Sequence, residues 1–214
     1  MNSATERLLV AGPAGGIDVA LDRPTTPALG VAVIAHPHPL HGGTRDNKVV
    51  QTLARALLAC GYICWRPNFR GVGESAGEYD EGRGETLDLL ALVTAAQDRA
   101  RAEGLADAPL VLAGFSFGSF VQSRVASTLA ASGAPAPRLI FIGAAVSRFA
   151  VDPVPPDTLV IHGETDDVVP LSAVFEWARP LDLPVVVIPG ADHFFHRKLP
   201  LLKRIVMAAF GNHD

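Results

Sequence analysis

A serine between two glycines stands at the end of an apolar run. Ser116 occurs in the segment Gly114 to Gly118, directly after the apolar stretch Leu110 to Ala113. A G-x-S-x-G pattern carries a nucleophilic serine when a buried strand turns sharply into a helix, because the turn lifts the hydroxyl above the sheet edge. The stretch Phe117 to Ala131 has helical spacing and supplies that helix. This context predicts that Ser116 is a nucleophile.

A second serine, Ser75, matches the same pattern in the segment Gly73 to Gly77. No buried strand leads into it, and the acidic, glycine-rich stretch Glu78 to Gly84 follows in place of a helix. Residues 71 to 76 also fit the dinucleotide pattern G-x-G-x-x-A, which requires a helix to begin immediately. We therefore interpret Ser75 as a loop serine and expect no dinucleotide site.

A nucleophilic serine needs a histidine to accept its proton and a carboxylate to orient the histidine. In a sheet with this turn, the chain order is serine, acid, histidine. The acidic loop after the apolar run at residues 159 to 161 offers Asp166 or Asp167, which the short reach favours over Glu164. The loop after the run at residues 185 to 188 offers His193 as the base. His196 is expected to begin the last helix as a surface or capping residue.

A developing oxyanion requires two backbone N–H donors, one from the residue after the nucleophile and one from a loop after an earlier strand. Phe117 supplies the first. The earlier loop, residues 36 to 43, contains two prolines that have no N–H group, so His38 or Leu40 must supply the second. We favour His38, which follows the predicted strand most closely.

Short apolar runs that alternate with helical stretches predict an α/β fold with a mostly parallel sheet and helices on both faces. A glycine-rich turn at residues 12 to 16 predicts an antiparallel hairpin at the sheet edge. We expect hairpin strands at Arg7 to Val10 and Ile17 to Leu21, and strands buried on both faces at Val31 to Ala35, Tyr62 to Trp65, Leu110 to Ala113, Leu139 to Ile142, Leu159 to Ile161 and Val185 to Ile188. Helices are expected at Asn47 to Ala59, Glu85 to Ala102, Phe117 to Ala131 and His196 to Phe210.

The chain has 214 residues, of which 49% are hydrophobic and 19% charged, and its formal net charge is −4. These values predict one globular domain over residues 1–214 and argue against a nucleic-acid partner. Only the residues from about Ser147 to Asp157 connect two of the predicted strands, which leaves no room for a cap domain. No segment approaches the roughly 18 apolar residues of a membrane span. Cys60 and Cys64 form neither a disulfide framework nor a redox pair, which fits a cytoplasmic protein.

Histidines and carboxylates are numerous enough to raise the alternative of a metal-dependent hydrolase. No ligand pattern fixed on one face, such as H-E-x-x-H, occurs among His36, His38, His41, Asp166, Asp167 and His193. The sequence therefore predicts neither a metal ion nor a cofactor. A non-catalytic binding protein that keeps the fold is the remaining alternative to an enzyme.

The chain resembles a family of small, lidless bacterial α/β-hydrolases, predicted serine hydrolases that share features with dienelactone hydrolases and acyl-ester hydrolases. The similar segments are residues 36–39, 42–44, 47–50, 68–73, 114–118, 162–170 and 192–196, which sample nearly the whole chain. The resemblance implies the α/β-hydrolase fold, with Asp166 as the acid, in the pattern H-G-x-x-D-x-x-V-P, and His193 as the base. It does not imply a particular substrate.

Together these features predict acyl transfer to water on Ser116, with a small ester or thioester as the substrate. A peptidase or another acyl hydrolase would use the same residues. We expect a monomer or a homodimer with no membrane partner.

Overall fold

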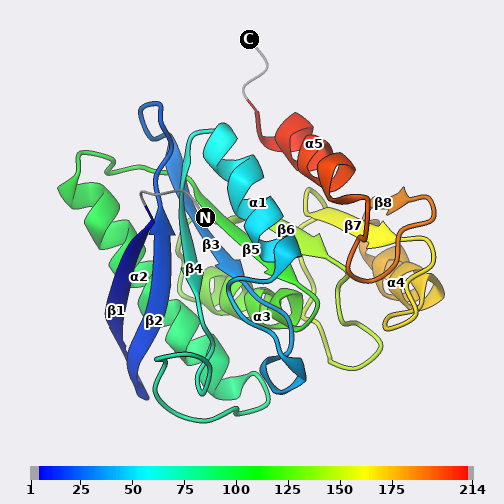
Figure 1. Ribbon diagram of the computed structural model, residues 1–214, viewed down its shortest axis with the longest axis horizontal. Helices are drawn as coiled ribbons and strands as arrows, with labels where there is room; N and C mark the ends of the chain where they lie inside the picture. Colours follow the sequence, from blue (N-terminus) through cyan, green and yellow to red (C-terminus); the bar gives the residue numbers. More distant parts are fainter. Residues whose placement is uncertain (1–4, 212–214) are drawn as a thin grey trace.

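An eight-stranded sheet runs through the computed structural model, which describes residues 5–211 (Figure 1). Its strands lie in the order β1-β2-β4-β3-β5-β6-β7-β8. They are β1 (Glu6–Gly12), β2 (Gly15–Asp22), β3 (Gly30–Ala35), β4 (Tyr62–Pro67), β5 (Leu110–Phe115), β6 (Arg138–Ile142), β7 (Leu159–Gly163) and β8 (Val185–Ile188).

The sheet is parallel from β4 to β8 and antiparallel at its N-terminal edge. In the β1–β2 hairpin, Glu6 lies opposite Leu21 and Gly12 opposite Gly15, and β2 is antiparallel to β4. The neighbouring pairs from β4–β3 to β7–β8 are all parallel. The predicted mostly parallel sheet with an N-terminal hairpin is confirmed. Because parallel strands end at the same edge, the loops after β3, β5, β7 and β8 meet there.

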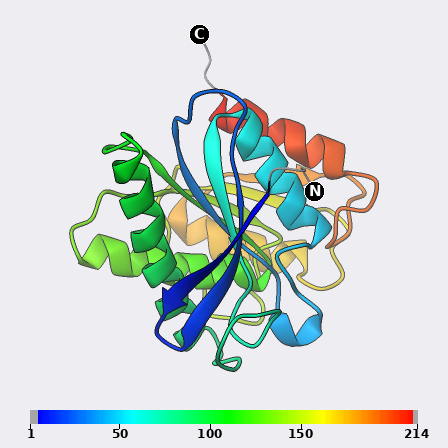
Figure 2. The same cartoon turned by 60° about the vertical axis from the view of Figure 1, so that its left-hand side comes forward.

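Helices cover both faces of the sheet. One face carries α1 and α5, and the other carries α2, α3 and α4, as the two views show (Figures 1 and 2). The helices are α1 (Lys48–Ala59), α2 (Arg83–Ala102), α3 (Phe117–Ala131), α4 (Leu171–Ala178) and α5 (Leu199–Phe210), with 3₁₀ turns η1 (Pro39–His41) and η2 (Arg179–Leu181). This arrangement is the α/β-hydrolase architecture that the alternating pattern predicts.

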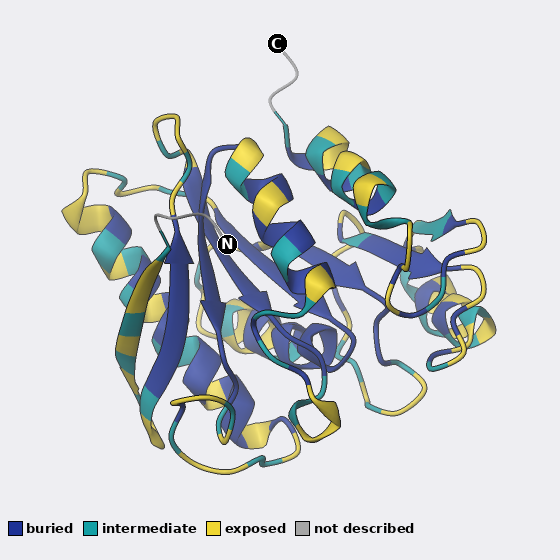
Figure 3. Ribbon diagram, viewed as in Figure 1, coloured by how far each residue is buried: buried dark blue, intermediate teal, exposed yellow. Residues whose placement is uncertain are grey.

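The two-residue period of the inner strands divides their side chains between two cores. In β3, Val31 and Val33 pack under α2 and α3, whereas Ala32 and Ile34 pack under α1 and α5. Every residue of β3, β4 and β5 is buried, so these strands appear uniformly dark in Figure 3. Their continuous apolar sequence therefore reflects burial on both faces.

Two sequence expectations need correction, and one helix was missed. Val185 to Val187 are only half-buried because β8 is the last strand of the sheet and has a neighbour on one side alone. The last helix begins at Leu199 and not at His196, since Phe195 and Arg197 have φ angles of 54° and 61° and cannot continue a right-handed helix. The short helix α4 was not predicted.

The connection between β6 and β7, residues 143–158, contains no helix or strand. In agreement with the expected absence of a cap, this segment is an irregular loop. Within residues 5–211, no helix is both long enough and apolar enough to cross a membrane.

Candidate active site

Ser116 occupies a strained turn between β5 and α3. Its φ and ψ angles are 55° and −116°, a conformation that L-residues rarely adopt. Its N–H donates to the carbonyl of Ile142 on the neighbouring strand at 2.9 Å. The turn therefore places the hydroxyl at the edge where the parallel strands end.

The two glycines of the motif are required by space. A Cβ atom on Gly114 would lie 2.4 Å from the backbone of Gly118 and Ser119, and one on Gly118 would lie 2.4 Å from the carbonyl oxygen of Ala35. Both contacts are with backbone atoms, which cannot swing away as a side chain can. The absence of side chains thus lets α3 begin tightly against β5 and β3.

The structure brings Ser116, His193 and Asp166 into a hydrogen-bonded chain. The Ser116 hydroxyl donates to Nε2 of His193 at 3.1 Å, and Nδ1 of His193 donates to Oδ2 of Asp166 at 2.7 Å. All three residues are buried. The serine proton thus has an acceptor, and the carboxylate fixes the tautomer that can accept it.

Asp166 is held as a carboxylate by the loop that carries it. Its Oδ1 accepts hydrogen bonds from the N–H groups of Val168 at 2.9 Å and Val169 at 2.7 Å. Burial by itself raises the pKa of Asp166, but the hydrogen bonds from His193 and Val169 outweigh it and lower the pKa below its ordinary value. Asp167 is exposed, so the geometry separates the two candidates that spacing left open.

His162, the last but one residue of β7, supports the same loop. Its Nε2–H donates to the carbonyl of Val169 at 2.9 Å, and this nitrogen lies 3.4 Å from Oδ2 of Asp166. The pKa of His162 is lowered, mainly by burial, so the ring is neutral near pH 7. Of the two histidines beside Asp166, His193 is the one that donates a hydrogen bond to its carboxylate.

Aromatic rings enclose the base. The ring of His193 lies 5.0 Å from that of Phe115 and 5.2 Å from that of Phe194, measured between centroids. His196 is exposed and pairs with Asp192 at 2.6 Å, away from the nucleophile. The structure thus places His193 in the site and His196 on the surface.

The candidate oxyanion donors are available at the start of α3 and in the loop after β3. Among residues 5–211, no hydrogen bond engages the N–H group of Phe117 or of His38. The N–H of Leu40 donates to Nδ1 of the His38 ring at 3.3 Å, and the Leu40 side chain is 68% exposed. The geometry therefore favours His38 over Leu40.

His36, which the sequence raised only as a possible metal ligand, has a role beside the site that was not predicted. It is fully buried directly after β3, where its Nε2 accepts the N–H of Phe69 at 2.9 Å. Its Nδ1 then carries the proton and donates to the carbonyl of Pro37 at 2.6 Å. Burial lowers the pKa of His36 to about 4, so the ring is neutral near pH 7. The H-P-H-P pattern was the available signal, but spacing alone does not show which histidine faces inward.

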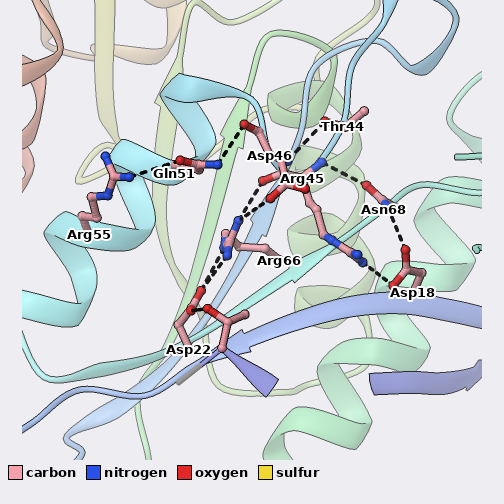
Figure 4. A network of polar contacts seen from close by, with 10 residues as sticks. Asp18, Asp22, Thr44, Arg45, Asp46, Gln51, Arg55, Arg66 and Asn68 are labelled. Atoms are coloured by element: carbon pink, nitrogen blue, oxygen red, sulfur yellow. Dashed lines mark hydrogen bonds and ion pairs between the residues drawn. The ribbon is translucent and has the colours of Figure 1, made fainter. Parts of the chain in front are cut away.

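A buried ion-pair network anchors the loop that follows residues 36 to 43, the segment with the candidate oxyanion donor His38 (Figure 4). Arg45 in this loop pairs with Asp18 of β2, and Asn68 accepts the Arg45 N–H at 3.0 Å. Arg66 of β4 donates to Asp22 of β2 at 2.8 Å and to the Arg45 carbonyl at 3.0 Å. Side chains thus replace the strand pairing that an irregular loop lacks.

Ser75 lies in a buried turn and takes no part in the Ser116–His193–Asp166 hydrogen-bond chain. Its hydroxyl accepts the N–H of Asp18 at 2.9 Å and donates to the carbonyl of Asn68 at 2.8 Å. Both bonds tie the turn to the sheet. Ser75 is therefore a structural loop residue, as its sequence context predicts.

A hollow of about 180 Å³ opens beside the Ser116 hydroxyl. Its walls are mainly apolar or aromatic and are formed by loops from the strand-end edge. The lining residues are Pro37, His38, His41, Gly42, Gly43, Asn47, Ser116, Phe117, Ala145, Arg148, Phe149, Val168, Val169, His193 and Phe194. Within residues 5–211, no three histidine, cysteine, aspartate or glutamate residues are grouped closely enough to hold a metal ion.

A parallel sheet with this sharp turn, bearing serine, acid and histidine in that chain order, defines an α/β serine hydrolase. Comparison with known proteins agrees. The chain is 36% identical to XC6422 of Xanthomonas campestris, a solved α/β serine hydrolase without a lid, with a TM-score of 0.84 over 98% of this chain and 94% of that one. An α/β serine hydrolase homologue from Coxiella burnetii is also 36% identical, with a TM-score of 0.81 over 95% and 96% of the chains.

A sequence relative extends the group. An uncharacterised protein of Rickettsia prowazekii, RP471, is 32% identical over 87% of this chain and 81% of its own length. No family model matches the chain. The chain belongs to the family of small, lidless α/β serine hydrolases.

Gly118→Ala tests the close approach at the turn. The added methyl group would meet the backbone of Ala35 and His36, so we expect the free energy of unfolding to fall by roughly 1–3 kcal/mol. Urea unfolding measures the change. Ser127→Ala, an exposed small-to-alanine change in α3, is the matched control and should leave the stability within about 0.5 kcal/mol. Equal effects of the two substitutions would contradict the steric argument.

The buried neutral ring of His36 predicts acid sensitivity. Its pKa in the folded protein is about 4 against an ordinary 6.5, so between these values the unfolded chain binds a proton that the folded protein does not. Stability must therefore fall as the pH falls through this window, by about 2 kcal/mol from neutral pH to about pH 5. Urea unfolding at several pH values measures the loss. It should be smaller in His36→Asn, and an identical pH dependence in both proteins would refute the assignment.

Proposed function

We propose that this protein hydrolyses carboxylic esters or thioesters of small acids through an acyl-enzyme on Ser116. The proposal rests on one observation above all. The Ser116 hydroxyl, His193 and Asp166 form a continuous hydrogen-bonded chain with distances of 3.1 and 2.7 Å. The membership of the chain in a serine hydrolase family also supports hydrolysis at Ser116.

In the acylation step, the Ser116 oxygen attacks the substrate carbonyl while Nε2 of His193 takes the hydroxyl proton. Asp166, already accepting from Nδ1, stabilises the resulting imidazolium. The carbonyl oxygen becomes an oxyanion that the N–H groups of Phe117 and His38 can bind. When the tetrahedral intermediate collapses, the bond to the alcohol or thiol breaks, and His193 gives its proton to the leaving group.

Deacylation repeats the same sequence with water. His193 removes a proton from water, the hydroxide attacks the acyl carbonyl, and the bond to Ser116 breaks as its oxygen recovers a proton. The acid product then leaves. The cycle restores the resting hydrogen-bond chain and consumes one water molecule for each bond cleaved.

The size of the hollow favours small acyl groups. At about 180 Å³ it is smaller than the roughly 300–1,000 Å³ typical of sites for drug-sized ligands. Phe117, Phe149 and Val168 give it apolar walls suited to a short hydrocarbon chain. We therefore expect short-chain esters to be better substrates than long-chain ones.

Ser116→Ala tests the assignment. On a panel of p-nitrophenyl esters, acyl-CoA thioesters and dipeptide amides, we expect turnover of the short-chain esters or thioesters by the wild type. Loss of the nucleophile should lower kcat at least about 10³-fold. Initial rates and labelling by a fluorophosphonate probe measure the effect.

Ser75→Ala provides the matched control, because Ser75 sits in the other G-x-S-x-G segment. It should keep its activity and its labelling, with a lower free energy of unfolding from the two hydrogen bonds lost. A wild-type protein that turns over no substrate and takes up no probe would refute the proposal. Turnover confined to the dipeptide amides would instead identify a peptidase.

A further inference from the structure

The hollow beside Ser116 has an arginine, Arg148, in its lining although the chain as a whole has a formal net charge of −4. None of its lining residues is an aspartate or glutamate. Arg148 contributes a full positive charge, and His38, His41 and Asn47 contribute further polar groups. An acidic protein therefore presents a wall free of carboxylates to its substrate.

Arg148 has no carboxylate of its own within the part of the chain that the structure describes. Other arginines near the sheet are paired, as Arg66 is with Asp22 and Arg70 with Asp88. Arg148 lies instead on the exposed loop between β6 and β7, next to Phe149 in the wall of the hollow. Burial lowers the pKa of the His38 ring, and electrostatic repulsion from His41 and Arg148 lowers it further. The charge of Arg148 therefore acts on the loop of residues 36 to 43, which carries His38.

We propose that Arg148 binds an anionic group of the substrate, so that the substrates are esters or thioesters bearing a carboxylate or phosphate. A guanidinium group binds such oxygens through two parallel N–H bonds. The apolar wall of Phe117 and Phe149 would hold the hydrocarbon between the scissile bond and the anion. This inference rests on the proposed hydrolysis at Ser116 and adds the substrate class.

Two substrate pairs test the proposal and locate the anion. Mono-4-nitrophenyl glutarate against 4-nitrophenyl valerate places a carboxylate on the acyl side. Butyryl-CoA against the butyryl thioester of N-acetylcysteamine places phosphates on the leaving group. In at least one pair, the wild type should prefer the anionic member by about fivefold or more in kcat/KM, the size of a partly exposed ion pair. The preference should weaken with added salt.

Substitution of Arg148 completes the test. Arg148→Gln should abolish the preference and Arg148→Glu should reverse it, whereas Arg179→Gln, an exposed arginine of η2 outside the hollow, should keep it. Ser116-dependent hydrolysis with no preference in either pair would overturn this inference and leave the proposed function standing. Absence of both hydrolysis and fluorophosphonate labelling of Ser116 would overturn the proposed function itself.

A second inference concerns His36 and depends on different contacts. The carbonyl of Pro37, which accepts the Nδ1–H of His36 at 2.6 Å, belongs to the same planar peptide unit as the N–H of His38. Fixing the direction of one end of a trans peptide fixes the direction of the other. The bond from Phe69 to Nε2, at 2.9 Å, determines which ring nitrogen carries the proton.

We infer that His36 is a positioning residue that aims the N–H of His38 at the oxyanion. The ring is fully buried and packs edge-on against Phe69 at 4.5 Å, so it cannot turn freely. Phe69 therefore holds His36, and His36 holds the Pro37 carbonyl. The other end of that peptide, the N–H of His38, then points to the oxyanion. His36 itself does not touch the reacting atoms.

Asparagine and glutamine separate the two bonds of His36. In His36→Asn the side-chain amide nitrogen replaces Nδ1 and keeps the donor to Pro37. In His36→Gln the amide oxygen replaces Nε2 and keeps the acceptor for Phe69. Each variant loses one buried hydrogen bond, so a purely structural role predicts similar losses of activity from both.

The positioning role predicts different results. His36→Gln should lower kcat by about tenfold or more with little change in KM, and should weaken binding of a trifluoromethyl ketone, which mimics the oxyanion. His36→Asn should keep kcat and inhibitor affinity within a few-fold of the wild type. Thermal unfolding establishes that both variants are folded during the assay. Equal losses of kcat in the two folded variants would overturn the inference.

Discussion

The backbone conformation of Ser116 is the constraint on which the rest of the site depends. A non-glycine residue at φ 55° and ψ −116° is strained and persists only where its surroundings leave no alternative. Here the Ile142 carbonyl holds its N–H, and the glycines on either side admit α3 against the ends of β5 and β3. The same strained turn brings the Ser116 hydroxyl within hydrogen-bond distance of His193 and leaves the N–H of Phe117 unbonded at the start of the helix.

Electrostatics around this turn depend on keeping buried histidines neutral. Burial lowers the pKa of both His36 and His162, so neither carries a charge near the catalytic hydrogen-bond chain at neutral pH. Each uses its one ring proton for a backbone carbonyl, Pro37 for one and Val169 for the other. The two neutral rings therefore shape the oxyanion loop and the acid loop, while the carboxylate of Asp166 is left to interact with His193.

The sequence predicts most of the fold and the three residues of the hydrogen-bonded chain because the patterns that identify them are local. A buried strand, a sharp turn and a helix identify Ser116, and the fixed chain order leaves few candidates for its partners. What distance along the chain does not encode is the direction in which a loop residue faces. Asp166 differs from Asp167, and His38 from Leu40, only once the loop has folded. For the same reason His36 was missed, and the last helix was begun three residues too early.

The ion pairs of β2 and β4 show how strands can fix the position of an irregular loop beside them. Burying Arg45, Arg66, Asp18 and Asp22 costs hydration, so such pairs add little to stability compared with apolar packing. Their geometry, however, is directional. Arg66 also binds the Arg45 carbonyl, and Asn68, the residue after β4, binds the Arg45 N–H, so both backbone polar groups of Arg45 are held in place. The network thus fixes the path of the chain between the oxyanion segment and α1, where apolar packing alone would allow several.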